Sequence, residues 1–553
     1  MSGIPAGGSA IGPAPRDDGA RRSRRGLLAA ALASTAELAS APRARAATFT
    51  PPGAVPGPPG AGSPGTLASP AGHGPHPVAG AAETNADSPA SPALLRRLVE
   101  RVGYGFDVSE FALALQLGAK GYVEHHLAPE AIDDNGLAAR LAPLASLPLS
   151  AQTLVELYAN TGLMPLPMHQ LKHASLLRAV YGKRQLLEKV VEFWTDHFAI
   201  RQSKGTVRYL KVVDDRDVIR AHAFGSFRDL LRASAHSAAM LRFLDNDTNT
   251  PAGPNENYAR ELLELHTLGV EGGYGEQDVK EAARCLTGWR FVPFGSVPYG
   301  VFTFIAAEHD DGAKLVLGHV FPPGGGVTDG ETLIELLASH PSTPRFVGRK
   351  LARWLLRYDP PEALVDAVVQ RWQATDGDVR EILRVILAPE WLVEAKLGQH
   401  PKLRRPFQFV AGLLRTLGAE IALPAVWTVQ PPLVDELHVL GQRPFEWFDP
   451  DGFPDTETAW ASGLQPRWSF ASRLLAGTMT GVQLDAGALL ARLAATGAAS
   501  AGEAVDLLLT GGAFSALDRS RLDAYAAAVP PTTWPKVAEL IALGASAPSY
   551  QVY

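Results

Sequence analysis

The chain has 553 residues, 46% of them hydrophobic and 20% charged, which is typical of a globular protein with one large core or two joined cores. Its formal net charge of −6 at pH 7 leaves no basic excess to neutralise phosphates, so nucleic acid is not an expected partner and binding to a membrane surface loses support. The single cysteine, Cys285, excludes an intramolecular disulfide and a cysteine-rich zinc site, and a metal would need oxygen or imidazole ligands.

The first 46 residues have the pattern of an export signal. Arg21, Arg22, Arg24 and Arg25 precede a short apolar run at 27–36, and Ala-Arg-Ala follows at 44–46. The segment Ser-Arg-Arg-Gly-Leu-Leu fits the twin-arginine pattern. We therefore expect residues 1–46 to direct export to the periplasm or beyond, with a lipid anchor or an uncleaved segment as alternatives. No later run is long and apolar enough to span a bilayer.

Residues 47–90 are dominated by Pro, Gly, Ala and Ser, which cannot bury enough apolar surface to fold. This segment is predicted to be a disordered linker.

From residue 91 onward, apolar residues recur at spacings of three and four, and the sequence predicts a mainly α-helical body over 91–480. Further helices are expected over 481–553, as part of the same core. The clearest predicted helices cover 183–198, 257–268, 276–286, 343–358, 361–373 and 378–387. One small β-hairpin is predicted near 299–321, with two β-prone runs flanking a turn at Asp311 and Gly312.

The stretch "NENYARELLELHTLG", residues 255–269, is unusually polar for a helix in a large protein. Asn255 can cap its first turn, and Glu256 lies at the positive end of the helix dipole. Arg260 is four residues from Glu256 and from Glu264, which is the spacing of helical ion pairs. One interpretation is therefore a solvated row of salt bridges on a surface helix.

The alternative interpretation of this helix is catalytic. At 3.6 residues per turn, Asn257, Glu261 and Glu264 share one face, whereas His266 points elsewhere. Glu261 or Glu264 could then act as a general acid or base, with Arg260 orienting the carboxylates.

The predicted helix at 183–198 has two different faces. Val190, Trp194 and His197 share an apolar stripe, and the opposite face carries the acids Glu188, Glu192 and Asp196. A histidine on an apolar stripe is more often a hydrogen-bonded core residue than a ligand. If the stripe packs against Glu261 and Glu264, however, His197 could be their proton partner or a metal ligand, and Trp194 would line the site.

Other polar groups are weaker site candidates. Asp245, Asp247, Asn249 and Glu256 occupy calcium-loop positions, although Thr250 replaces the glycine of that pattern and an Asn/Asp-rich turn explains the same residues. His309, Asp310 and Lys314 could form a catalytic group, with turn formation as the structural alternative. His340, Arg345 and Lys350 could bind an anion, although surface cations are the usual explanation.

Long stretches of the sequence resemble a bacterial family of unknown function, DUF1800. They include "FWTDHF", the segment from "DNDTNTPAGPNENYARELLELHTLG" to "CLTGW", "HPSTPRFVGRKLARWLL" and "LGQRPFEWFDPDGFPDTETAW". The resemblance implies a mostly helical, exported protein, often encoded beside a sulfatase-like partner. Gly275 departs from the family, which often has threonine there, and this puts hydroxyl chemistry at that position in doubt.

Two functions are consistent with these observations. The first is an exported enzyme that acts on an extracytoplasmic substrate, such as a polymer or its modifying group, through His197, Glu261, Glu264 and Arg260, with a divalent metal as a candidate cofactor. The second is a non-catalytic envelope protein that binds or assembles with a partner, in which the polar motif is a buried salt-bridge network. An enzyme requires a cavity where these side chains converge, whereas a scaffold requires them to satisfy one another.

Overall fold

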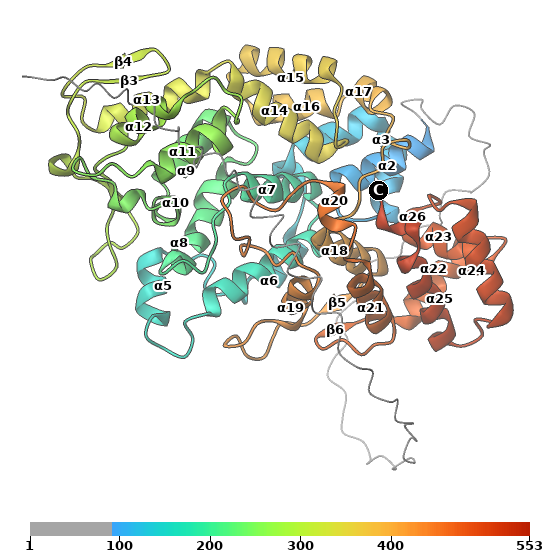
Figure 1. The fold of residues 1–553 in the computed structure, drawn as a ribbon. Helices are drawn as coiled ribbons and strands as arrows, with labels where there is room; N and C mark the ends of the chain where they lie inside the picture. The colour runs from blue at the N-terminus through green and yellow to red at the C-terminus, as the bar shows by residue number, and fades with distance from the viewer. Residues whose placement is uncertain (1–90) are drawn as a thin grey trace, which may run out of the picture. The chain divides into compact units, whose positions relative to one another are not determined.

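The structure is a computed structural model that describes residues 91–553 (Figure 1). The predicted export signal and linker, residues 1–46 and 47–90, lie outside the described residues. The described chain is mainly helical, with small two-stranded sheets, so the predicted mainly α-helical body is confirmed.

The helices before residue 250 include α7, which borders several of the others. They are α2 (Pro92–Val102), α3 (Val108–Leu127), η1 (Pro129–Ala131), α4 (Asn135–Leu141), α5 (Ala151–Tyr158), α6 (Leu166–Tyr181), α7 (Gln185–His197), α8 (Val207–Asp214), η2 (Asp215–Arg220), α9 (Phe227–His236), α10 (Ala238–Phe243) and η3 (Asn246–Thr248). α7 packs against α2, α3, α6 and η2. Its apolar stripe explains this position, because Val190 and Trp194 are fully buried.

The middle of the chain is a further helical layer. It comprises α11 (Glu256–Glu261), η4 (Leu262–Thr267), α12 (Glu276–Cys285), η5 (Ala306–Glu308), α13 (Val327–Ser339), α14 (Ser342–Leu355), α15 (Glu362–Thr375), α16 (Val379–Ile386) and α17 (Pro389–Glu394). The predicted helices at 276–286, 343–358, 361–373 and 378–387 correspond to α12, α14, α15 and α16 within a few residues.

The last part of the chain contains α18 (Pro406–Leu417), α19 (Pro432–Val439), α20 (Glu457–Trp460), α21 (Leu464–Leu475), α22 (Ala486–Ala495), α23 (Ala501–Thr510), α24 (Ala516–Ala528), α25 (Trp534–Ser546) and α26 (Pro548–Gln551). Their apolar side chains form a second core cluster with α6, whereas α2, α7 and the middle helices form the first. Helices after residue 480 therefore share a core with α6 and α18.

The predicted hairpin near 299–321 differs from the observed strands. β1 (Trp289–Phe291) pairs with β2 (Phe302–Phe304), and β3 (Lys314–Val316) pairs with β4 (His319–Phe321), so the two β-prone runs belong to separate sheets. The tight turn lies at Leu317 and Gly318, which both have positive φ. At the predicted turn, the Gly312 amide instead donates to the Asp310 side chain at 2.9 Å. A third sheet, which we did not predict, joins β5 (Glu420–Ile421) to β6 (Val482–Gln483).

Two π-helices change which side chains share a face. In η4, the Leu268 amide donates to the Leu263 carbonyl at 2.8 Å, five residues back, so the 3.6-residue period ends after Glu261. In η2, the same wider turn brings Arg220 beside Asp215, with Nε 3.0 Å from Oδ2. A pair five residues apart would not share one face of an α-helix.

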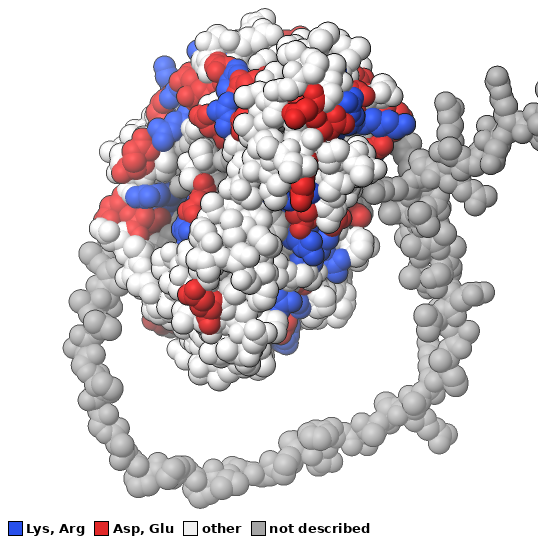
Figure 2. Space-filling model, turned by 90° about the vertical axis from the view of Figure 1, so that its left-hand side faces the viewer, with Lys and Arg blue, Asp and Glu red and all other residues white. Residues whose placement is uncertain are grey.

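No helix among residues 91–553 has the length and apolar character needed to cross a membrane. On the face shown in Figure 2, basic and acidic side chains are interspersed, and neither sign forms an extended patch. This face therefore offers no basic surface of the kind that nucleic acid requires.

Candidate functional site

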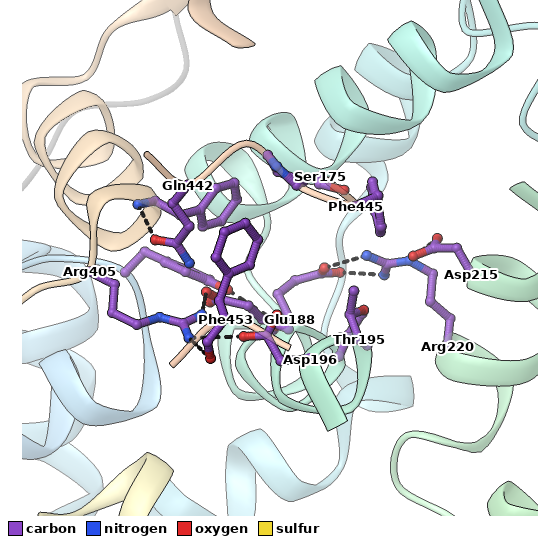
Figure 3. A pocket seen from close by; sticks show the side chains of 15 residues that line it. Ser175, Glu188, Thr195, Asp196, Asp215, Arg220, Arg405, Gln442, Phe445 and Phe453 are labelled. Atoms are coloured by element: carbon purple, nitrogen blue, oxygen red, sulfur yellow. Dashed lines mark hydrogen bonds and ion pairs between the residues drawn. The ribbon is translucent and has the colours of Figure 1, made fainter. Parts of the chain in front are cut away.

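A small cavity lies against the acidic face of α7, with a volume of about 60 Å³. Side chains from α6, α7, η2 and the segment 442–453 line it (Figure 3). The lining includes four acids, Glu188, Glu192, Asp196 and Asp215, and two arginines, Arg220 and Arg405. A cavity of this size has room for a few water molecules or one small polar group.

Arg405 joins two of these acids. It precedes α18 and donates to Asp196 Oδ2 at 2.9 Å and to Glu192 Oε1 at 2.5 Å. Its side chain is only 2% exposed, and the guanidinium stacks over the Trp354 ring at 4.3 Å. Arg405 therefore holds both carboxylates at fixed positions in a site with little water.

Tyr104 completes the environment of Glu192. Its hydroxyl donates to Glu192 Oε2 at 2.7 Å. Burial, together with the charge of Glu192, raises the pKa of Tyr104 well above its ordinary value, so the phenol stays protonated and remains a donor.

The opposite wall of the cavity is a second ion-pair group. Arg220 forms two hydrogen bonds to Glu188, at 3.0 and 2.8 Å, and also binds Asp215 (Figure 3). The two parallel hydrogen bonds fix the position of the Glu188 carboxylate. The π-turn of η2 places Asp215 and Arg220 on the same side of the helix.

Asp196 has the electrostatic property most relevant to chemistry. Burial raises the pKa of Asp196 to about 6, with Glu192 adding to the increase and Arg405 opposing it. Its side chain retains 18% exposure. A carboxyl group in this state can gain or lose a proton near neutral pH.

The segment 442–455 closes over this face of α7. Gln442, Phe445 and Phe453 line the cavity, and Phe407 donates its backbone amide to the Gln442 side chain at 2.9 Å. Asp455 at the end of the segment binds Lys402 at 2.7 Å. The segment is thus anchored near both ends while it covers the acids.

His197 does not take part in this cavity, because it lies on the opposite stripe of α7. Its Nε2 donates to the His266 carbonyl at 3.0 Å, and its Nδ1 accepts from Lys350 Nζ at 3.0 Å. Burial lowers the pKa of His197 well below its ordinary value and lowers that of His266 to about 3, so both rings are neutral. The structure therefore brings together three predicted residues, His197, His266 and Lys350, but as a buried hydrogen-bonded group.

Glu261 and Glu264 are not hydrogen-bond partners of His197, because both ring nitrogens of His197 are already used by other groups. Glu264 accepts from the Tyr274 hydroxyl at 3.4 Å, and Glu261 is 6% exposed. His197 therefore has hydrogen-bond partners other than the two predicted glutamates, and the π-turn at η4 changes the helical face on which the prediction relied. The catalytic role of Glu261 and Glu264 stays a prediction.

Arg260 forms one of the two ion pairs that its spacing predicted. Arg260 binds Glu256 at 3.0 Å, as the spacing predicted, and its other partner is Glu276 at 2.8 Å. Asn255 caps α11 by accepting from the Asn257 amide at 3.0 Å, which confirms the predicted cap.

Further candidate binding residues have structural roles. The Trp194 indole donates to the Ala223 carbonyl at 3.1 Å within the core. The Asn257 side chain donates to the Leu244 carbonyl at 3.1 Å. Neither side chain faces the α7 cavity, which has other lining residues.

The calcium-loop candidates bind other protein groups. Asp245 pairs with Lys204 at 2.6 Å, and Asp247 pairs with Arg242 at 2.8 Å. The Asn249 side chain bonds to backbone groups of Ala283 and Asn255, and Glu256 pairs with Arg260. Within residues 91–553, no three His, Cys, Asp or Glu side chains gather in a geometry that could hold a metal ion.

The candidates on the β-sheet insertion are locked in a buried network. Asp329 lies 2.6 Å from Lys314 Nζ and 3.2 Å from His309 Nε2, and all three side chains are at most 3% exposed. Asp310 instead binds Arg284 at 2.7 Å. The three predicted residues therefore do not form one catalytic group, and Asp329 was not predicted.

The predicted anion contacts are also separated. Arg345 pairs with Glu362 and Asp366 on α15, and the His340 ring accepts from the Ser342 amide at 3.2 Å. Lys350 is the one member of this group that reaches another candidate, His197.

Sequence reasoning recognised the acidic face of α7 but did not assign a site to it. The available signal was the repeat of Glu188, Glu192 and Asp196 at exact helical spacing on a helix that also had to be buried. The basic residues that pair with this face come from distant segments, and periodicity alone does not identify them.

The comparisons place the chain in a family. The model of the family described as "Protein of unknown function (DUF1800)" matches residues 97–552, so the protein belongs to this family. No curated protein and no solved structure matches the chain.

Proposed function

We propose that the protein is an exported enzyme that performs acid–base chemistry in the α7 cavity on a small polar group of an extracytoplasmic substrate. One observation carries the proposal: the Asp196 carboxyl lines a cavity and has a pKa raised to about 6. General acid–base catalysis is most efficient when the pKa of the group lies near the working pH. The proposed chemistry therefore takes place on the acidic face of α7, opposite the face that carries His197.

The surrounding residues have distinct roles in this proposal. Asp196 transfers the proton. Arg405 binds both Asp196 and Glu192, so it stabilises the negative charge that remains when Asp196 is ionised. The hydroxyls of Ser175 and Thr195 line the same cavity and can orient a polar substrate group or a water molecule.

The cavity size restricts the substrate class. A volume of about 60 Å³ does not admit a polymer chain, but it admits a small modifying group or the polar end of a longer molecule. The cavity therefore supports a reaction in which a proton is transferred while a small polar group is added to the substrate or removed from it.

A second candidate function is a non-catalytic envelope protein that binds or assembles with a partner, such as a sulfatase-like protein. One observation favours it: each of the acids Glu188, Glu192, Asp196 and Asp215 already has an arginine partner. A fully paired network of this kind can fix the packing of helices without any ligand.

An activity screen separates the two candidates. Purified protein is tested on chromogenic esters, phosphate monoesters and glycosides, together with Asp196→Asn and a distant control, Glu390→Gln. An enzyme of the proposed type turns over at least one substrate, and Asp196→Asn lowers the rate by about 100-fold or more while the control is unchanged. No turnover on any class, or equal turnover by Asp196→Asn, overturns the acid–base proposal and favours the envelope-protein function.

Export through residues 1–46 is a separate part of the proposal. It is supported by the paired arginines that precede a short apolar run. Replacing Arg24 and Arg25 by lysine in a native host is expected to retain the protein inside the cell, as measured by fractionation. Unchanged export of this variant contradicts the twin-arginine route.

A further inference from the structure

A second cavity lies on the other side of the segment 443–446 from the α7 cavity. Arg443 and Glu446 line this second cavity, whereas Pro444 and Phe445 line the α7 cavity. Its volume is about 220 Å³, large enough for a small organic molecule. We call it the Arg208 cavity, after a residue at the start of α8 that lines it.

Positive charge predominates in the Arg208 cavity. Lys172, Arg208 and Arg443 line it, against one lining carboxylate, Glu446, and a second carboxylate, Asp435, pairs with Arg443 at 3.0 Å. Charges of one sign in a recess with low-dielectric walls concentrate counter-ions. The lining charges therefore favour an anion.

The lining carboxylate is already shared by several donors. Glu446 binds both Lys172 and Arg443, the latter at 3.2 Å, and accepts from Gln202 Nε2 at 3.4 Å. Lys172 is only 1% exposed and has Glu446 as its counter-ion, so its charge is held in the wall of the cavity.

Arg208 is the unpaired member of the group. Its guanidinium has no hydrogen-bond or ion-pair partner in the part of the chain that the structure describes, although it lines the cavity. Arg208 is half-buried, whereas two other donors that line the cavity, Gln430 Nε2 and Arg443 Nε, are buried without an acceptor. Buried donors usually have an acceptor, so these two groups favour a ligand that accepts hydrogen bonds.

We propose that the Arg208 cavity binds an oxyanion group, namely the phosphate, sulfate or carboxylate of a small organic molecule, with Arg208 as its principal contact. The planar guanidinium suits two parallel hydrogen bonds to such a group, and Lys172 and Arg443 add charge from the walls. This binding site is independent of the acid–base chemistry proposed for the α7 cavity.

Calorimetric titration of the purified chain with inorganic phosphate, sulfate and acetate, at constant ionic strength, tests the proposal. Saturable binding of one equivalent of at least one anion is expected, and the preferred anion identifies the oxyanion class. Arg208→Gln is expected to weaken binding by about 10-fold or more, the loss of one charge-assisted interaction. Because Arg208 has no partner in the described fold, this variant is expected to keep its unfolding temperature.

Two further variants sharpen the result. Arg521→Gln, whose side chain is 65% exposed, is the matched arginine control and is expected to bind normally. Asp196→Asn is also expected to bind normally, so failure of the acid–base proposal leaves this one intact. Absence of saturable binding for all three anions, or equal binding by Arg208→Gln, overturns it.

Discussion

Gly452 lies against the backbone carbonyl oxygen of Asp196, so closely that a Cβ atom at position 452 would come within 2.1 Å of that oxygen. Gly452 also has a φ of +74°, in the left-handed region that favours glycine. The covering segment therefore reaches the acidic face of α7 only because this position lacks a side chain.

Gly452→Ala is predicted to lower the free energy of unfolding by about 2 kcal/mol or more, because the methyl group displaces the segment from Asp196 and the backbone is strained. Gly477→Ala is the matched control, since Gly477 has a φ of +68° but no atom within 4 Å of an added Cβ. The control is expected to cost about 1 kcal/mol from backbone strain alone. Equal losses in urea unfolding of the two variants would contradict the close contact.

Asp196 is predicted to give the fold a specific pH dependence. Its pKa is raised to about 6 from 3.8, so the folded chain holds a proton that the unfolded chain releases between these values. Its contribution to stability is full below pH 3.8 and is lost as the pH rises through about 6. Relative to Asp196→Asn, the wild type is therefore expected to become less stable from pH 4 to 6 by up to roughly 3 kcal/mol, measured by urea unfolding. A constant difference across this range would contradict the raised pKa.

Periodicity predicted local features of the fold well. The spacing of apolar residues located α7, α12 and α14, and the Asn255 cap and the Arg260–Glu256 ion pair were confirmed, because each depends on neighbours within four residues. The strand pairing was missed because a partner strand can come from elsewhere in the chain, as Trp289–Phe291 does for Phe302–Phe304.

The site was harder to predict for the same reason. Arg405 is 209 residues from Asp196, and Lys350 is 153 residues from His197, so no local pattern links them. The π-turn of η4 also has no simple sequence signature, yet it decides where Glu264 points. The two faces of α7 could be distinguished from the sequence, but not which of them borders a cavity.

Lys189 is predicted to destabilise the fold at neutral pH. It is 1% exposed, its Nζ has no hydrogen-bond partner, and burial lowers its pKa to about 7 from 10.5. The rings of Tyr104, Trp354 and Tyr553 lie 5.0 to 5.5 Å from Nζ and offset part of the cost by cation–π attraction.

Lys189→Met is therefore expected to be more stable than the wild type at pH 7, and the gain should be smaller at pH 9. The sign follows from the lowered pKa: the lysine contribution is full above pH 10.5 and is lost as the pH falls through about 7. Urea unfolding at both pH values measures the effect, with the exposed Lys120→Met as control. A gain that does not depend on pH would show that packing, not charge burial, is responsible.

His266 is predicted to contribute to acid unfolding. Burial lowers its pKa to about 3 from 6.5, so its contribution to stability is full above pH 6.5 and is lost as the pH falls toward 3. One such group changes the free energy of unfolding by about 1.4 kcal/mol per pH unit. His266→Phe is expected to reduce the slope between pH 6 and 4 by up to this amount, whereas the exposed His438→Phe is not. Equal slopes for wild type and His266→Phe would contradict the buried, neutral imidazole.

Asp329 is predicted to be a structural residue that neutralises Lys314 and accepts from His309. Because the Lys314 side chain is 0% exposed, Asp329→Asn leaves a buried ammonium without its counter-ion and is expected to cost about 3–5 kcal/mol. The double variant Asp329→Asn/Lys314→Met removes both charges and is expected to recover part of that loss in urea unfolding. Recovery identifies charge burial as the cause, and it would not occur if Asp329 acted through packing alone.

Since this network is separate from the residues lining the Arg208 cavity, anion binding by the folded fraction of Asp329→Asn should match the wild type. If Asp329→Asn is as stable as the wild type, the structural role of Asp329 is contradicted, and the catalytic interpretation of His309 and Lys314 is again favoured.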